Sequence, residues 1–453
     1  MNDRPHLIVP VETAARELDA KLLLSLFAVN EGMTVTLGNK ALLNLRIGGL
    51  KPGIYLSHNF NAGRDRIISL ARRLGHTVAA WDEEGLVWIN EEIYRRRRAS
   101  ASAMAHLDLL LLWGDEQAKA LRPVTEHLRA KISISGNPRA DLLRPELRGL
   151  YSGRVEALKA ELGGFILVNS NFGWINHSLA KSRHGPVDEH LQEVSAKSGF
   201  PFAYLQHRYN IYRAFTSVIP RIAARFPERK IVVRPHPSEN REGWAAEVGG
   251  VPNVIVRYDN DLIPWLLAAS HILQNGCTTA VETAMLGRAA ISFRPLIVPE
   301  HEIPQPHRVS HTARNEAELI ALLSDRSVTD AVPATFSSAL DEMVEGLHGP
   351  LASARIAGEM SRVLRSSNAK PASARRLIAK GGSLIRRLEK SVLRHVPGSA
   401  SQAHYVSQKF PPVSATEIAA RLSGFASRLS LPEPRVTQVS DRIFSIEPAS
   451  SRN

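Results

Sequence analysis

The sequence predicts an α/β protein built from two doubly wound domains, and two observations support this fold class. Short apolar runs of strand length alternate with segments of helical periodicity, as a parallel sheet with covering helices requires. The chain has 453 residues, more than usually pack around a single hydrophobic core. Because 44% of these residues are hydrophobic, the chain can bury two cores.

The first series of elements occupies residues 1–160. Helical patterns cover residues 13–29 and 65–74. The expected strands are residues 7–11, 33–37, 53–56, 77–81, 107–112 and 131–135. We therefore expect an N-terminal domain over residues 1–160.

A second series of similar size follows it. The expected strands are residues 165–169, 230–233, 254–257, 271–273 and 289–293. The helical patterns lie at residues 186–198, 209–226, 262–269 and 279–286. We expect a second domain over residues 161–335 and a helical return segment over residues 336–365.

Residues 366–453 have a different composition, rich in Ser, Ala, Arg and Pro, and we expect a basic, partly disordered tail. Residues 374–396 place apolar residues near helical spacing among Lys and Arg, the pattern of a basic amphipathic helix. Such a helix could attach the chain to an anionic membrane at the inner face of the cytoplasmic membrane, which vesicle binding would test. The alternative is a disordered, solubilising extension. Beyond residue 397 we expect loose order, although residues 415–429 could form a short helix.

The formal charge of +13 is concentrated in this tail. Residues 351–453 hold 17 Lys and Arg against 6 Asp and Glu, a net +11, which leaves only +2 for residues 1–350. A protein that binds nucleic acid usually carries its basic charge on the nucleic-acid-binding domain, so nucleic acid is not an expected partner.

The sequence also argues against a disulfide-bonded, metal-binding, membrane-spanning or secreted protein. Cys277 is the only cysteine, and the 17 histidines show no metal-binding spacing, so we expect no disulfide, metal or cofactor. No apolar run approaches the roughly 20 residues of a spanning helix, and the N-terminus lacks the pattern of a signal peptide. We therefore expect a cytoplasmic protein.

Two strand ends are followed by turns suited to a phosphate-containing ligand. After one strand come Arg234, Pro235, His236 and Pro237, where the prolines would hold the imidazole in place. The alternative is a rigid turn with an exposed histidine.

The other turn contains Gly276, which permits a tight bend, and Thr278 and Thr279, which offer hydroxyls at a helix start. Glu282 lies one helical turn after Thr278 and could bind ribose hydroxyls. The alternative for Glu282 is a capping-box partner of Thr279. Glu282 could bind ribose hydroxyls and also act as the capping-box partner.

A third strand end, in the first domain, carries the carboxylates of Asp82, Glu83 and Glu84. Clustered carboxylates raise one another's pKa by like-charge repulsion, which suits a general base or nucleophile. The alternative is a solvated acidic turn. Weaker candidates for donor or acceptor contacts lie in other loops at strand ends: Asn137, Arg139, Asn169, Ser170 and Asn171.

Taken together, these motifs resemble the bacterial surface carbohydrate biosynthesis proteins, glycosyltransferases of GT-B architecture related to transferases that use CMP-Kdo. Their acidic motif before a glycine is matched by residues 82–85, their His-Pro motif by residues 234–237, and their Ser/Thr motif by Thr278 and Thr279. The match covers about residues 5–330. It departs in having three acidic residues before the glycine, and a Thr pair in place of the commoner serine.

The resemblance implies two Rossmann-like domains facing a cleft. It also implies a catalytic carboxylate among residues 82–84, of which we expect Glu83 or Glu84 to be essential, and a CMP-binding role for His236 and the Thr pair. The implied reaction transfers Kdo or a related acid sugar to a glycan or lipid-linked acceptor of lipopolysaccharide or capsule. The alternatives are a CDP-glycerol-type phosphotransferase, a UDP-sugar 2-epimerase, and a non-catalytic binding protein of the same fold.

Overall fold

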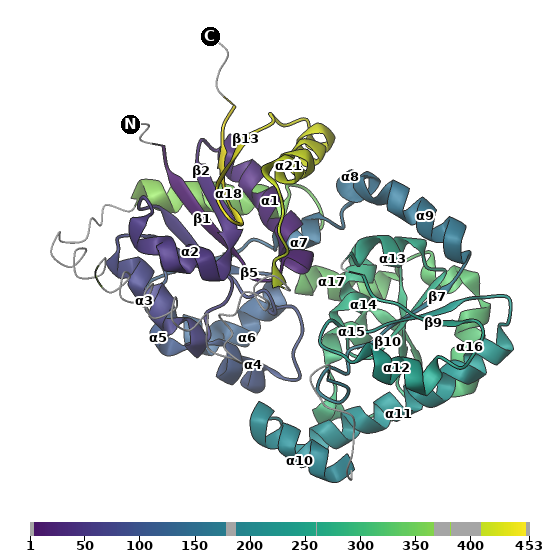
Figure 1. The fold of residues 1–453 in the computed structure, drawn as a ribbon. Helices are drawn as coiled ribbons and strands as arrows, with labels where there is room; N and C mark the ends of the chain where they lie inside the picture. Colours follow the sequence, from purple (N-terminus) through teal and green to yellow (C-terminus); the bar gives the residue numbers. More distant parts are fainter. Residues whose placement is uncertain (1–3, 178–186, 260, 367–380, 382–408, 450–453) are drawn as a thin grey trace. The chain divides into compact units, whose positions relative to one another are not determined.

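The computed structural model describes residues 4–177, 187–259, 261–366, 381 and 409–449. The chain divides into two compact units. Unit 1 comprises residues 1–86, 91–148 and 342–453, and unit 2 comprises residues 87–90 and 149–341. Each unit has its own mainly parallel sheet covered by helices (Figure 1). The predicted α/β class with two Rossmann-like domains is confirmed, and the cleft between them stays a prediction.

The sheet of unit 1 has the strand order β13-β14-β2-β1-β3-β4-β5-β6. The strands β1 to β6 are parallel to their neighbours, whereas β14 pairs antiparallel with both β2 and β13. The bounds are β1 (His6–Val11), β2 (Thr34–Asn39), β3 (Ile54–Ser57), β4 (Thr77–Ala80), β5 (Leu109–Leu112), β6 (Lys131–Ile134), β13 (Arg435–Ser440) and β14 (Ile443–Glu447).

The helices of unit 1 include α1, which lies against both α18 and α21. Their bounds are α1 (Ala14–Asn30), α2 (Lys40–Arg46), α3 (Asp65–Arg73), α4 (Glu91–Arg98), α5 (Ala101–Met104), α6 (Asp115–Thr125), α7 (Pro138–Asp141), α8 (Pro145–Arg148), α18 (Ala352–Ser366) and α21 (Ala415–Leu429), with the 3-10 turns η1 (Ile47–Gly49) and η2 (Ala62–Arg64).

The sheet of unit 2 has the order β12-β11-β10-β7-β8-β9, and all its pairings are parallel. The strands are β7 (Ile166–Asn169), β8 (Ile231–Arg234), β9 (Val254–Val256), β10 (His271–Gln274), β11 (Ala290–Phe293) and β12 (Ser310–Ala313). The helices are α9 (Ser152–Leu162), α10 (Val187–Ser198), α11 (Phe202–Arg225), α12 (Arg241–Val248), α13 (Ile263–Ala268), α14 (Thr278–Met285), α15 (Pro304–Arg308), α16 (Glu316–Ser324) and α17 (Ala334–Met343), with η3 (Gly149–Tyr151), η4 (Pro299–His301) and η5 (Arg326–Thr329).

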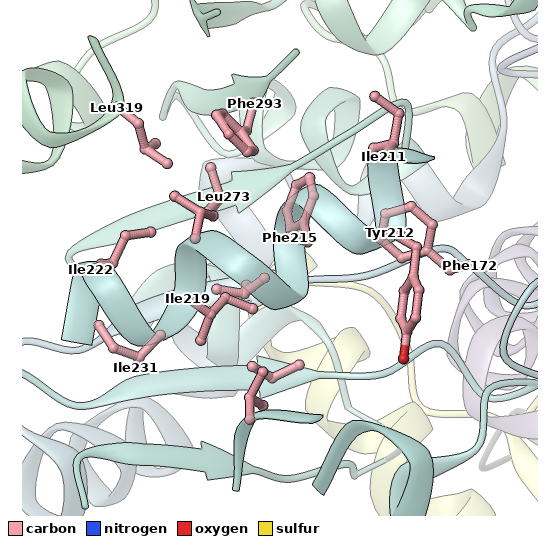
Figure 2. Packing of buried hydrophobic residues seen from close by; sticks show 14 of the residues in the cluster. Phe172, Ile211, Tyr212, Phe215, Ile219, Ile222, Ile231, Leu273, Phe293 and Leu319 are labelled. Atoms are coloured by element: carbon pink, nitrogen blue, oxygen red, sulfur yellow. The ribbon is translucent and has the colours of Figure 1, made fainter. Parts of the chain in front are cut away.

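The core of unit 2 fixes the long helix α11 against the sheet (Figure 2). Phe172, in the loop after β7, makes edge contacts with Tyr212 and Phe215 of α11, at ring-centroid distances of 5.5 and 5.6 Å. Aromatic pairs in such T-shaped arrangements contribute about 0.5–1.5 kcal/mol beyond the area that they bury. This packing holds the loop after β7 rigidly beside α11.

The C-terminal part of the chain differs from the sequence-based expectation. Residues 409–449 belong to unit 1, where β14 pairs with β2 and α21 packs against α1. Gly38 of β2 allows this pairing, because a Cβ atom there would lie 2.3 Å from the carbonyl oxygen of Arg442. The expectation of loose order is therefore wrong for this segment, although the predicted helix at Ala415–Leu429 is present.

Two other expectations concern the boundary between the domains and the basic amphipathic helix. The boundary expected at residue 160 lies inside α9, which belongs to unit 2, so the division falls at residues 148 and 149. The basic amphipathic helix expected at residues 374–396 lies outside the described residues apart from Gly381. Within the described part of the chain, no helix combines the length and the apolar character needed to cross a membrane.

Candidate functional site

The first candidate site lies at the carboxyl ends of β7, β8 and β10 in unit 2. The chain runs from the central strand β7 to β8 on one side, and later places β10 on the other side. Ligands of open α/β sheets bind outside the strand ends at such a reversal of strand order. The two predicted phosphate turns follow β8 and β10, and the weaker candidates Asn169, Ser170 and Asn171 follow β7. Unit 2 therefore gathers these candidates at one edge.

Direct contacts join the three loops. The amide nitrogen of Asn169 donates to the hydroxyl of Thr279, and the guanidinium of Arg234 donates to Asn169 Oδ1 at 3.5 Å. Asn171 Nδ2 donates to the carbonyl oxygen of Gly276 at 2.9 Å. The loop after β7 thus bridges the two predicted phosphate turns.

Arg208 of α11, which sequence reasoning missed, points its guanidinium at this bridge. It donates to Asn275 Oδ1 and to Asn171 Oδ1, each at 2.6 Å, and it stacks on Phe172. Arg208 is only 7% exposed, and no carboxylate of the described residues forms an ion pair with it. Burial lowers the pKa of Arg208. An unpaired buried cation is costly, so its presence at strand ends points to an anionic ligand.

Arg234 of β8 is a second buried guanidinium, also 7% exposed. It donates to the backbone carbonyl of Asp259 at 2.8 Å and lies over the ring of Tyr258. The Asp259 carboxylate pairs instead with Arg154 and accepts a hydrogen bond from Trp265. Among the described residues Arg234 forms no ion pair, and its buried Nε atom has no hydrogen-bond partner. Burial lowers its pKa as well.

The turn before α14 has the expected shape. Gly276 has φ +62°, a left-handed conformation that favours glycine, and a Cβ atom there would lie 3.7 Å from the guanidinium of Arg208. Thr278 begins the helix and is half-buried. Gly276, two residues before the start of α14, therefore lies close to the cation of Arg208.

The structure excludes one alternative for Thr279 and Glu282, while the ribose contact of Glu282 stays a prediction. The hydroxyl of the buried Thr279 contacts Asn169 and the sulfur of Cys277, so it holds the turn together. The N-cap of α14 is Cys277, without any side-chain cap hydrogen bond, so the capping-box alternative for Thr279 and Glu282 is wrong. Glu282 is half-exposed.

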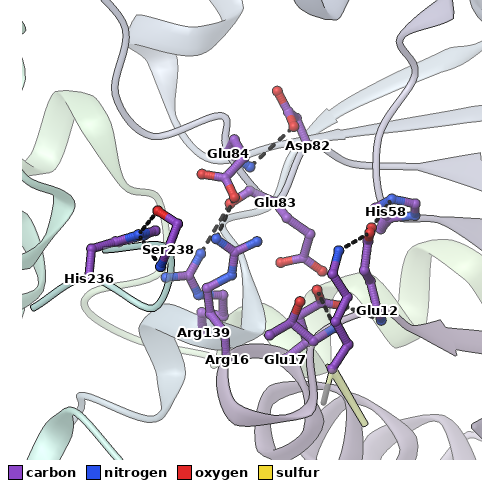
Figure 3. Close-up of polar contacts among 12 residues, drawn as sticks. Glu12, Arg16, Glu17, His58, Asp82, Glu83, Glu84, Arg139, His236 and Ser238 are labelled. Carbon is purple, nitrogen blue, oxygen red and sulfur yellow. Dashed lines mark hydrogen bonds and ion pairs between the residues drawn. The ribbon is translucent and has the colours of Figure 1, made fainter. Parts of the chain in front are cut away.

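His236 is exposed in the turn after β8, and its predicted contact with a donor phosphate stays a prediction. Its Nδ1 lies 2.8 Å from the hydroxyl of Ser238 and accepts the backbone N–H of Ser238 at 3.3 Å (Figure 3). Pro237 lies between the two. These bonds orient the ring through Nδ1.

Glu239, which sequence reasoning did not single out, anchors this turn to the loop after β7. Its carboxylate accepts the backbone N–H groups of His236 and Phe172, the hydroxyl of Ser170, and the indole N–H of Trp244. Burial raises the pKa of Glu239. Ser170 therefore holds the scaffold in place, and its hydroxyl is already engaged.

The second candidate site is the acidic turn after β4 in unit 1. The fully buried Asp82 accepts hydrogen bonds from Arg98 Nε at 2.9 Å and from the hydroxyl of Tyr94 at 3.1 Å. Arg98 comes from the basic run at the end of α4. Asp82 is thus enclosed by protein partners.

Glu83 is also buried. It accepts the indole N–H of Trp81 at 2.9 Å and pairs with Lys21 of α1 at 3.1 Å. Lys21 also pairs with Glu17 at 2.6 Å and donates to the carbonyl oxygen of Pro10 at 2.8 Å. The buried triad of Glu17, Lys21 and Glu83 fastens the acidic turn to the first helix.

Glu84 is the carboxylate of this turn that solvent reaches, with 45% of its side chain exposed. It pairs with Arg16 (Figure 3). Burial acts to raise the pKa of Glu84, but the positive charges of Arg16, Arg139 and Arg98 outweigh it and hold the pKa below its ordinary value. The expectation that the carboxylates raise one another's pKa is wrong for Glu84.

Asn137 and Arg139 lie beside this turn in unit 1. Asn137 caps α7, accepting the backbone N–H of Arg139 at 3.0 Å. Arg139 donates to the carbonyl oxygen of Glu83 at 3.1 Å and packs over the ring of Trp113. Asn137 Oδ1 therefore has a structural role, whereas its buried Nδ2 has no hydrogen-bond partner among the described residues. Arg139 contributes positive charge to the acidic turn.

The buried triad gives a stability prediction. Lys21→Met is expected to lower the free energy of unfolding by about 3–5 kcal/mol, because it leaves the carboxylates of Glu17 and Glu83 buried without their cation. Urea denaturation measures this change. The control is Lys119→Met on the exposed face of α6, which should stay within about 0.5 kcal/mol of wild type. Equal effects of the two substitutions would contradict the buried role of Lys21.

The same triad predicts that the free energy of unfolding depends on pH in the acid range. Burial acts to raise the pKa of Glu17, but the charges of Lys21 and Arg16 lower it from its ordinary 4.5 to about 2. A carboxylate with a lowered folded-state pKa contributes stability that is complete above pH 4.5 and is lost as the pH falls toward 2. The unfolding free energy of the wild type should fall over this window, and more steeply than that of Lys21→Met.

Among the described residues, no group of three or more His, Cys, Asp or Glu is placed to hold a metal ion. The candidate residues instead form two clusters, one in each unit. In unit 2, hydrogen bonds join Asn169, Asn171, Arg208, Arg234 and Gly276, and Glu239 links the turn of His236 to the same loop. In unit 1, they join Asp82, Glu83, Glu84, Arg98 and Arg139.

No protein-family model matches the chain, and no curated protein matches it. Solved structures do show similarity. The UDP-GlcNAc 2-epimerase from Neisseria meningitidis bound to UDP-GlcNAc is 13% identical, with a TM-score of 0.47 over 80% of this chain and 100% of the other. The UDP-GlcNAc 2-epimerase from Methanocaldococcus jannaschii is 12% identical, with a TM-score of 0.49 over 80% and 100%. The wall teichoic acid polymerase TagF is 9% identical, with a TM-score of 0.46 over 81% and 90%.

Proposed function

We propose that the chain is a nucleotide-sugar-dependent glycosyltransferase of bacterial surface polysaccharide synthesis, with its donor site at the carboxyl edge of the unit 2 sheet. The observation that carries this proposal is the pair of buried guanidiniums, Arg208 and Arg234, which form no ion pair with the described residues and flank the loop after β7. Two cations at one reversal of strand order suit a ligand with two anionic groups.

A CMP-linked acid sugar is the proposed donor. It carries a phosphate that joins the nucleoside to the sugar and a carboxylate on the sugar, so each guanidinium can take one of them. His236 and the N–H groups at the start of α14 would stabilise the charge on the departing CMP. Kdo or a related acid sugar is the proposed group that is transferred to a glycan or lipid-linked acceptor.

Glu84 is the carboxylate proposed to act on the acceptor or on the developing sugar cation. It is exposed, whereas Asp82 and Glu83 are enclosed by their partners. Its lowered pKa keeps it ionised at neutral pH, which suits electrostatic stabilisation of a cationic transition state. It could also accept a proton from the acceptor hydroxyl as the hydroxyl attacks.

A second candidate function uses a substrate linked to a nucleoside diphosphate, as CDP-glycerol-type phosphotransferases and UDP-sugar 2-epimerases do. The same pair of guanidiniums favours it, because two cations suit two phosphates as well as a phosphate and a carboxylate. A non-catalytic binding protein would share this site but would not turn over its ligand.

Donor preference separates these proposals. Melting scans with CMP, CMP-Kdo, CDP and UDP are expected to show the largest stabilisation with CMP-Kdo, about 2.7 kcal/mol at 100 times Kd. Hydrolysis of the same donors without acceptor then tests for catalysis. Greater stabilisation by CDP or UDP would favour the second candidate, and binding without any hydrolysis or transfer would favour a non-catalytic protein. No stabilisation by any nucleotide would overturn the donor site.

A further inference from the structure

A second polar cluster lies at the carboxyl ends of β1 and β3 in unit 1, next to the acidic turn, where the backbone N–H of Glu83 donates to the carbonyl oxygen of His58 at 3.1 Å. β1 has β2 on one side and β3 on the other, so the strand order reverses here too. Glu12, after β1, accepts hydrogen bonds from Lys40 Nζ at 2.5 Å and from His58 Nε2 at 2.8 Å (Figure 3). Lys409, from the C-terminal part of the chain, pairs with the other oxygen of Glu12 at 2.9 Å.

Positive charge is in excess around this cluster. Arg64, at the end of η2, forms no ion pair with the described residues, but its charge reaches Lys40. Burial first, and then the charges of Arg64 and Lys409, bring the pKa of Lys40 down to about 8, although Glu12 acts to raise it. Burial lowers the pKa of His58 to about 4, so its ring is neutral at neutral pH. Lys40 and Lys409 therefore both pair with Glu12, and Arg64 adds a further positive charge that reaches Lys40.

The loop after β3 also holds polar atoms without partners. Asn59 Oδ1, Asn61 Oδ1 and Arg64 Nε are shielded from solvent, and none has a hydrogen-bond partner among the described residues. Asn59 is only 9% exposed. Buried polar atoms are rarely left unpaired, since each costs about 1–3 kcal/mol. A hydroxyl could satisfy an asparagine oxygen, and an oxyanion could satisfy the guanidinium.

We propose that the loop of residues 58–64, with Lys40 and Lys409, binds an oxyanion on a hydroxylated acceptor. Arg64 takes the phosphate or carboxylate, and Asn59 takes a neighbouring hydroxyl. The carboxylate of Glu12 also lies here, but the two lysines neutralise it. The assignment of this ligand as the acceptor rests on the proposed function, whereas the binding itself does not.

Calorimetric titration of the full chain with glycerol 3-phosphate and with glucuronate tests the site, since both probes carry hydroxyls beside an anion. Arg64→Gln is expected to weaken binding about tenfold. Arg66→Gln, an exposed arginine at the start of α3, is the matched control and should stay within about twofold of wild type. The probe that binds more tightly identifies a phosphate or a carboxylate as the preferred anion.

A third substitution separates this site from the donor site. Arg208→Gln should leave probe binding intact, and Arg64→Gln should leave nucleotide-induced stabilisation intact. If Arg208→Gln abolishes probe binding while Arg64→Gln does not, the anion belongs to unit 2 and the inference fails, although the proposed donor site stands. Failure of both probes to bind the wild type also overturns it.

Asn59→Ala tests the hydroxyl contact. It should weaken binding of glycerol 3-phosphate and glucuronate several-fold but leave inorganic phosphate unaffected, because inorganic phosphate lacks the neighbouring hydroxyl of the probes. Unchanged affinity for all three ligands would remove Asn59 from the site. A melting scan of each variant establishes that it is folded before titration.

Discussion

Arg208→Gln is expected to lower the affinity for the donor nucleotide about 100-fold, equivalent to ~2.7 kcal/mol. Arg208 is buried beside the start of α14 and forms no ion pair with the described residues. A ligand anion would complete its coordination with charge-assisted hydrogen bonds, which are the stronger kind. Calorimetric titration with CMP and with the sugar nucleotide measures the loss.

The matched control is Arg229→Gln. Arg229 is similarly buried, but it lies before β8 and bonds to Leu323 and Ser270 at the amino ends of the strands. Its substitution should change stability without changing nucleotide affinity. A folded Arg208→Gln protein that binds nucleotide as tightly as wild type would contradict the donor site.

Arg234→Gln extends this comparison. If one guanidinium binds the sugar carboxylate and the other the phosphate, one substitution weakens only the sugar nucleotide, and the other weakens CMP as well. If one substitution instead weakens CDP but leaves CMP binding unchanged, a diphosphate donor is favoured.

Glu84→Gln is expected to lower kcat by a factor of about 10²–10⁴, the usual contribution of a positioned acid or base. Donor affinity and the melting temperature should stay near those of the wild type, because Glu84 is about half exposed and its pairing with Arg16 lies at the surface. Steady-state kinetics with the donor that the screen selects measures the effect.

Asp82→Asn provides the structural comparison within the same turn. Asp82 is fully buried and accepts from Arg98 and Tyr94, so its substitution should lower the free energy of unfolding by about 1–3 kcal/mol. The two variants thus separate a loss of chemistry from a loss of stability. Wild-type turnover by Glu84→Gln would exclude Glu84 as the catalytic carboxylate.

Much of the fold is visible in the sequence because strands and turns leave local signals. The eleven predicted strands are all present, with ends that shift by one or two residues. The C-terminal hairpin was missed although Ile443, Phe444 and Ile446 supply apolar residues, since a short exposed hairpin is stable only when paired to a larger sheet. That pairing, with β2, joins residues hundreds of positions apart.

Arg208 illustrates which part of the candidate site could not be predicted from neighbouring residues in the sequence. It lies on the apolar face of α11, between the buried residues Leu205 and Tyr212. The helix begins at Phe202, whereas the helical pattern was expected only from residue 209, so Arg208 was not recognised from the sequence as a core position. Its meaning depended on Asn171 and Asn275, which only the folded chain brings to it.

By itself, the sequence determined the α/β class, the order of the strands along the chain, and the turns that carry Arg234, His236, Gly276 and the acidic residues. These follow from hydrophobic periodicity and turn chemistry, which act over a few residues. Only the tertiary structure decided which charges are compensated: Asp82, Glu83 and Glu84 each have a cationic partner, whereas Arg208 and Arg234 form no ion pair with the described residues. Ionisation depends on burial and on charges within a few ångströms, and these neighbours come from distant parts of the chain.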